Sequence, residues 1–142
     1  MNIISAILSG LAGTLMMTVL MYIAPAMGMP KMDIIGMLGT MFTANQGAAR
    51  VMGTVAHFMI GAVFAIIYAL LWSFGIGSPT WLWGLIFGAV HGVITMMMIP
   101  IMMKMHPRPP QMDSGAMMMV GMLMGHMAFG LVVALTYSAL VS

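Results

Sequence analysis

The chain has 142 residues, of which 63% are hydrophobic and 4% charged, and its net charge is +2. Because soluble domains carry about 25% charged residues, this composition excludes a water-soluble globule, and the length allows one domain over residues 1–142. The six charged side chains form no basic patch, and the chain has no cysteine. Nucleic acid is therefore excluded as a partner, and disulfides and thiolate metal sites are excluded as well.

Four apolar stretches are long enough to cross a bilayer, which requires roughly 20 residues. They run from about 3 to 24, 51 to 74, 81 to 99 and 115 to 140, and none contains Asp, Glu, Lys or Arg. They are too long and too uniform for the alternating strands of about ten residues that build a β-barrel. The sequence therefore predicts an all-α integral membrane protein with four transmembrane helices in contact with the lipid bilayer.

Proline and glycine mark the connections between these stretches. Pro25 follows the first stretch, residues 75–79 form a tight turn before the third, and residues 105–110 separate the third from the fourth. The long first connection predicts a short interfacial helix that Asp33 caps. The apolar residues on one face of that helix are Ile34, Ile35, Leu38, Met41 and Phe42.

All four basic residues lie in two connections, Lys31 and Arg50 in the first, and Lys104 and Arg108 in the third. Cytoplasmic loops of membrane proteins carry an excess of Lys and Arg. These two connections are therefore predicted to face the cytoplasm, and both termini to lie outside. The predicted location is a bacterial-type inner membrane, crossed several times.

The second and fourth stretches match each other without gaps when His57 is placed on His126. Gly61 then coincides with Gly130, and Tyr68 with Tyr137. The first and third stretches match more weakly, and the only two acids follow methionine in equivalent loops, in the pairs Met32-Asp33 and Met112-Asp113. The pattern predicts two tandem helix hairpins, residues 1–74 and 75–142, related by an axis along the membrane normal.

Small residues recur every fourth position on each apolar stretch. Such ladders let membrane helices approach closely. The ladders of the second and fourth stretches share a face with His57 and His126, so both histidines are expected in helix–helix contacts. The ladders consist of Ser5, Ser9 and Gly13; Gly53, Gly61, Ala65 and Ala69; Gly84, Gly88 and Gly92; and Gly130, Ala134 and Ser138.

Three histidines lie inside the apolar stretches, where polar groups are costly and often functional. One hypothesis is that His57 and His126 face each other across the repeat axis and, with His91, bind a metal ion. A further hypothesis is haem, held by two histidines. The alternative is that each histidine hydrogen-bonds to a carbonyl, tyrosine or threonine and only fastens helices. His106 lies in the proline-rich loop and is predicted to be solvated.

Methionine occurs 24 times. Its thioether is a soft ligand that selects Cu(I), and Met119 and Met122 have the one-turn spacing that could place two sulfurs together, while Met98 shares a face with His91. The alternative is that methionine fills gaps between helices as a flexible apolar residue. The complete set of candidate metal ligands is His57, His126, His91, Met119, Met122 and Met98.

Catalysis has little support in the sequence. Asp33 and Asp113 are the only carboxylates, both in loops, and no nucleophile, phosphate-loop or zinc-protease motif occurs. The chain is therefore predicted to be a non-enzymatic helical bundle. The favoured role is an accessory or structural subunit of a larger membrane complex, or a homo-oligomer, built by contact with other transmembrane helices. The alternative role is Cu(I) handling by the intramembrane histidines and methionines.

Several segments resemble a family of small bacterial four-span membrane proteins of unknown function. They are residues 10–18, Ala24-Pro25, residues 30–39, Ala56-His57, residues 84–91 and Gly125-His126-x-x-x-Gly130. The resemblance covers most of the chain and implies a four-helix membrane fold. Because this family has no established activity, the resemblance implies no functional residues.

Overall fold

The computed structural model describes residues 1–111 and 115–142, and all regular structure within them is helical. Four segments, α1 with η1, then α3, α4 and α5, are long and apolar enough to cross a membrane. The predicted all-α, four-span fold is confirmed. In chain order the elements are α1 (Ile3–Ile23), the 3-10 turn η1 (Ala24–Met27), α2 (Ile34–Thr40), α3 (Gln46–Ser73), α4 (Trp81–Met105) and α5 (Ala116–Val141).

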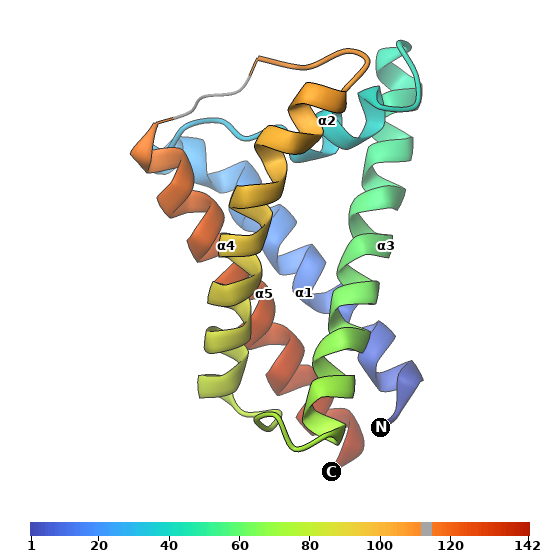
Figure 1. Ribbon diagram of the computed structural model, residues 1–142, viewed down its shortest axis with the longest axis vertical. Helices are drawn as coiled ribbons and strands as arrows, with labels where there is room; N and C mark the ends of the chain where they lie inside the picture. The colour runs from blue at the N-terminus through green and yellow to red at the C-terminus, as the bar shows by residue number, and fades with distance from the viewer. Residues whose placement is uncertain (112–114) are drawn as a thin grey trace.

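Both termini and the turn between α3 and α4 lie at one end of the bundle, and α2 lies at the other (Figure 1). The Met112-Asp113 pair, which supported the predicted repeat, lies outside the described residues. The repeat itself stays a prediction.

Polar side chains begin three of the helices, because the first backbone N–H groups of a helix have no partner within it. Asn2 accepts a hydrogen bond from the N–H of Ser5 (3.1 Å) at the start of α1. Asp33 caps α2, as predicted, by accepting from Gly36 (2.8 Å). Asn45 caps α3, which therefore begins well before the predicted start at residue 51.

Helix α4 continues past its predicted end at residue 99 and includes Pro100. Proline removes one backbone hydrogen bond, but membrane helices tolerate it where local adjustments satisfy the freed carbonyl. Pro100 is exposed and so does not disturb the packing against α5. The helix ends at Met105, because the backbone of a residue before proline avoids the helical region and His106 precedes Pro107.

The helices pack as a chain of neighbours, with α3 against α1, α1 against α5, and α5 against α4. Glycine permits two of these approaches. A Cβ atom on Gly10 of α1 would lie 2.8 Å from the Cα atom of Ala62 and 2.8 Å from the Cβ atom of Ala65. A Cβ atom on Gly84 of α4 would lie 2.8 Å from the Cβ atom of Ala134. Gly84 belongs to the predicted ladder of α4, which is a surface of close helix contact. Gly10 lies outside the predicted ladder of α1, although all three members of that ladder are buried.

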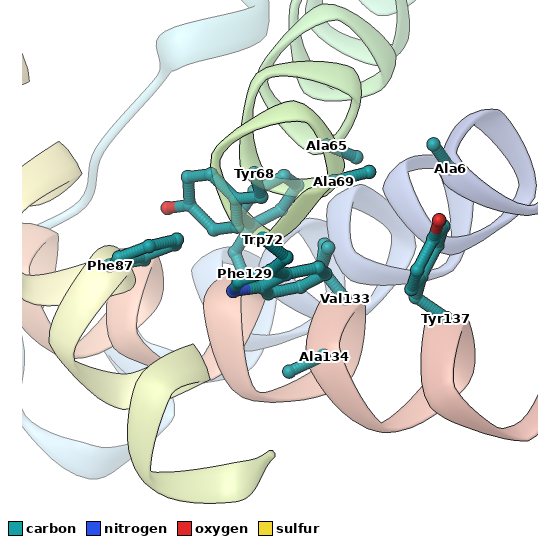
Figure 2. Close-up of a cluster of buried hydrophobic side chains, with 10 residues drawn as sticks. All are labelled: Ala6, Ala65, Tyr68, Ala69, Trp72, Phe87, Phe129, Val133, Ala134 and Tyr137. Atoms are coloured by element: carbon teal, nitrogen blue, oxygen red, sulfur yellow. The ribbon is translucent and has the colours of Figure 1, made fainter. Parts of the chain in front are cut away.

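Helices α3 and α4 meet through aromatic side chains near the turn that joins them. The rings of Tyr68 and Phe87 are 5.2 Å apart, and those of Trp72 and Phe87 are stacked at 6.0 Å. These side chains belong to a buried cluster that also contains Phe129 and Val133 of α5 (Figure 2). Bulky rings between the two helices keep their backbones apart near this turn.

Helix α2 packs against α3. Its buried apolar side chains are Ile35, Met37 and Leu38. The predicted apolar face is therefore only partly correct, because the helix ends at Thr40 and Phe42, just beyond it, is 60% exposed. An ion pair between Asp33 and Arg50 (2.7 Å) joins the start of α2 to α3.

The predicted orientation can be tested by labelling, because the chain has no cysteine of its own. Ser78→Cys, in the turn between α3 and α4, should react in intact cells with a maleimide that cannot cross membranes. Lys104→Cys, near the end of α4, should react only after permeabilisation, because the positive residues are expected inside. Reaction of position 104 in intact cells would contradict the orientation.

Candidate functional site

A cavity of about 560 Å³ lies between α3 and α4 and is not closed off from its surroundings. Residues of α1, η1, α2 and α5 complete its wall. Ten methionines of the described part of the chain line it, and none of the lining residues found there is charged. The polar side chains in the wall are His57, His91, His126, Thr14 and Thr95. The three intramembrane histidines thus border one space.

His126 on α5 uses both ring nitrogens. Its Nδ1 atom donates to the backbone carbonyl of Met122 (2.8 Å), and its Nε2 atom therefore accepts from the hydroxyl of Thr95 on α4 (3.3 Å). A neutral imidazole has one donor and one acceptor, so the hydrogen-bonding capacity of His126 is filled. This histidine matches the alternative interpretation, in which a histidine fastens two helices.

His91 on α4 is held on two sides. The hydroxyl of Tyr68 on α3 lies 3.3 Å from its Nδ1 atom, at hydrogen-bonding distance. Its ring stacks on Phe64 at 3.7 Å between ring centroids and meets the edge of His126 at 4.7 Å. The structure thus brings His91 and His126 together, and His91 also bridges to α3.

His57 on α3 is the exception. Its side chain is buried, yet its Nε2 atom has no hydrogen-bond partner among the described residues. The other buried side-chain nitrogen without a partner there is Nε1 of Trp72, in the aromatic cluster outside the cavity. An unsatisfied buried polar atom costs about 1–3 kcal/mol. A functional site can tolerate this cost, because a bound ligand supplies the missing hydrogen bond.

His57 and His126 occupy equivalent positions in the predicted repeat, and their environments differ. The bond from His126 to the carbonyl four residues earlier is not repeated at His57. The difference follows from the packing, because α4 packs closely on α5 and supplies Thr95 to His126, whereas α3 does not pack closely on α4. The two histidines match in sequence, but within the described residues the tertiary structure gives hydrogen bonds to both ring nitrogens of His126 and none to His57.

The candidate methionine ligands lie in different surroundings. Met98 and Met122 line the cavity, and Met122 is buried. Met119 is 54% exposed and does not line the cavity. Within the described residues, no group of three or more His, Cys, Asp or Glu side chains has a geometry that could hold a metal ion. The predicted metal and haem sites stay predictions.

The prediction that His106 is solvated is wrong. Its side chain is 5% exposed, and its Nε2 atom donates to the backbone carbonyl of Met37 in α2 (2.9 Å). Its Nδ1 atom accepts from the N–H of Arg108 (3.0 Å), and the Arg108 guanidinium donates to the carbonyl of Thr40 (2.8 Å). The connection after α4 folds back onto α2, a long-range contact that the local sequence does not reveal.

The pattern of a family of unknown function, DUF6789, matches residues 1–142. The chain belongs to that family. No curated protein and no solved structure matches the chain. The resemblance noted in the sequence to a four-span family of unknown function is thereby confirmed, and membership adds no functional residue to those that the cavity presents.

Proposed function

We propose that this protein is a non-enzymatic membrane protein that binds an apolar or amphipathic molecule of the lipid phase in the cavity between α3 and α4. The observation that carries the proposal is an open, mostly apolar cavity whose wall includes His57, a buried histidine with an unpaired Nε2 atom. Small-molecule sites are mostly apolar hollows of about 300–1,000 Å³ with few polar groups, and 560 Å³ lies within that range.

The architecture supports entry of such a molecule from the bilayer. Helices α3 and α4 lack the close backbone packing that joins the other neighbouring spans, so the cavity is expected to open between them. Methionine side chains are flexible and adapt to the shape of what they contact. A wall with many methionines therefore suits a ligand with an apolar body.

The absence of catalysis is part of the proposal. Asp33 is engaged with Arg50 and with the start of α2, and the described lining of the cavity has no carboxylate. Nδ1 of His126 donates its proton to a backbone carbonyl, and Nε2 accepts a hydrogen bond from Thr95. His126 therefore has no free nitrogen to act as an acid or base. His57 has an unpaired nitrogen, but the described lining offers no carboxylate with which it could form an acid–base pair, so the arrangement supports binding of a ligand.

The proposal is tested by filling the cavity. Gly125 lines it, and a Cβ atom there would make ordinary contact with Met17 at 3.5 Å, so Gly125→Leu should fold and occupy the space. Ala139→Leu, at an exposed position on the same helix, is the matched control. Lipids that co-purify in mild detergent are measured per chain by mass spectrometry. Wild type and Ala139→Leu should retain one apolar species that Gly125→Leu loses, and equal content in all three would contradict the proposal.

A second candidate is Cu(I) binding, because the unpaired Nε2 atom of His57 and the thioethers of Met98 and Met122 border the same cavity. Imidazole and thioether together suit Cu(I). The same preparations distinguish the two functions by their copper, iron and zinc content. Near-stoichiometric copper that is lost in Met98→Leu and kept in Met119→Leu, with no retained lipid, would favour copper. The predicted accessory or homo-oligomeric role concerns the outer faces of the bundle and stays a prediction.

A further inference from the structure

The charges and hydrogen bonds of the side chains that line the cavity indicate which chemical class of ligand fits it. We infer that the ligand is an electroneutral amphipathic molecule with a hydroxyl or carbonyl group that hydrogen-bonds to Nε2 of His57. This inference rests on the proposed function and deepens it by naming the chemical class. Three features of the wall carry it: the absence of charge among the described lining residues, a histidine (His57) with no hydrogen bond to either ring nitrogen there, and the apolar surface around it.

A charged headgroup would find no counter-ion in this cavity. The described lining contains no Asp, Glu, Lys or Arg. Both arginines are engaged elsewhere, because Arg50 pairs with Asp33 and Arg108 binds the carbonyl of Thr40. Lys31 lines a separate, smaller pocket beside that ion pair. Since an unpaired ion is far more costly to bury than a hydrogen-bonded neutral group, the ligand should carry no charge.

The hydrogen bonds already made by the polar side chains of the wall leave His57 as the partner for the polar group of the ligand. Thr95 and His126 satisfy each other, and Tyr68 occupies Nδ1 of His91. Nε2 of His91 has no partner among the described residues, but His57 is the lining histidine with neither ring nitrogen bonded. A hydroxyl can donate to or accept from Nε2 of a neutral imidazole, whichever tautomer is present, and a carbonyl can accept from its N–H form. Both groups therefore fit, whereas a pure hydrocarbon would leave Nε2 unpaired.

The alignment of α3 with α4 determines which residues surround the polar group of the ligand. Tyr68 lies opposite Phe87, and Phe64 lies opposite His91. Continued along the two antiparallel helices, this register places His57 level with Met98, and both line the cavity. The remaining wall towards α2 is formed by methionine and aliphatic side chains such as Leu38. The apolar part of the ligand would lie along this surface.

The test uses three photoreactive probes with the same 12-carbon chain and diazirine: an alcohol, a hydrocarbon and a sulfonate. Each is added to the full-length protein in phosphatidylcholine vesicles, and cross-linked residues are mapped by mass spectrometry. The alcohol should label cavity residues and outcompete the hydrocarbon by about tenfold, the factor expected for one buried hydrogen bond. His57→Leu should remove this preference, while His57→Gln, which keeps a hydrogen-bonding group, and Met119→Leu on the outer face should preserve it.

Each other outcome has a distinct meaning. Cavity labelling that is equal for alcohol and hydrocarbon, and unchanged in His57→Leu, would overturn the inference and leave the proposed function standing. Preferred cavity labelling by the sulfonate would overturn the neutrality of the ligand. Labelling confined to the outer faces for all three probes would overturn both the inference and the proposed function.

Discussion

Replacing His57 with leucine should stabilise the delipidated protein, and replacing His126 with leucine should destabilise it. The two histidines are buried to a similar degree, but only His126 has both ring nitrogens hydrogen-bonded. Removal of an unsatisfied buried atom relieves a cost of about 1–3 kcal/mol, so His57→Leu should raise the free energy of unfolding by about 1 kcal/mol.

His126→Leu acts in the opposite direction. It removes the bond to Met122 and leaves the Thr95 hydroxyl without its partner on α5. Interhelical hydrogen bonds in membranes contribute from about 0.6 to 2 kcal/mol, and the histidine also packs closely on Gly92, where a Cβ atom would lie 3.2 Å from that of His126. The expected loss is about 1–2 kcal/mol. Unfolding by a denaturing detergent, followed by circular dichroism, measures both variants.

The opposite signs separate a binding residue from a structural one. A residue that only fastens helices should lower stability when it is removed, as at His126. A residue held unsatisfied for a ligand should raise stability and lower binding together, as at His57. Equal destabilisation by the two leucine variants would show that His57 has a structural bond in the folded protein and would remove the basis for its assigned role.

Gly130→Ala should cause a large loss of stability by adding a single methyl group between α4 and α5. A Cβ atom at Gly130 would meet the carbonyl oxygen of Gly84 and would lie 2.9 Å from both the N and Cα atoms of Gly88. All three are backbone atoms, so a change of side-chain rotamer cannot relieve the clash. Helix α4 must therefore move away from α5. Overpacking of this kind costs typically 1–3 kcal/mol, occasionally more, and we expect about 3 kcal/mol.

Gly125→Ala on the same helix is the matched control. Its Cβ atom would lie 3.5 Å from the Cγ atom of Met17, an ordinary contact with a flexible side chain. Glycine to alanine favours a helix by up to about 1 kcal/mol, and this gain is the same in both variants. Gly125→Ala should therefore be neutral or stabilising in the detergent titration. Comparable stability of the two variants would contradict the packing of α4 on α5.

Hydropathy alone predicted the four helices, because the requirement that makes them helical acts within each span. A chain in hydrocarbon must satisfy its backbone hydrogen bonds within each span, so an uncharged apolar run of about 20 residues forms a helix whatever its neighbours are. The cap at Asp33 was predictable for the same reason, since it depends on residues three positions apart. Small-residue spacing also indicated which faces are buried, including those of His57 and His126.

The partners of the polar side chains were decided by the tertiary structure. Helical periodicity gives the depth and face of a residue, but not the separation between helices, which here depends on the aromatic rings of Tyr68, Trp72 and Phe87 between α3 and α4. That separation creates the cavity, leaves His57 unpaired, and brings His126 to Thr95 and His91. The burial of His106 likewise requires a loop to meet α2 from far along the chain, a contact that no local pattern contains.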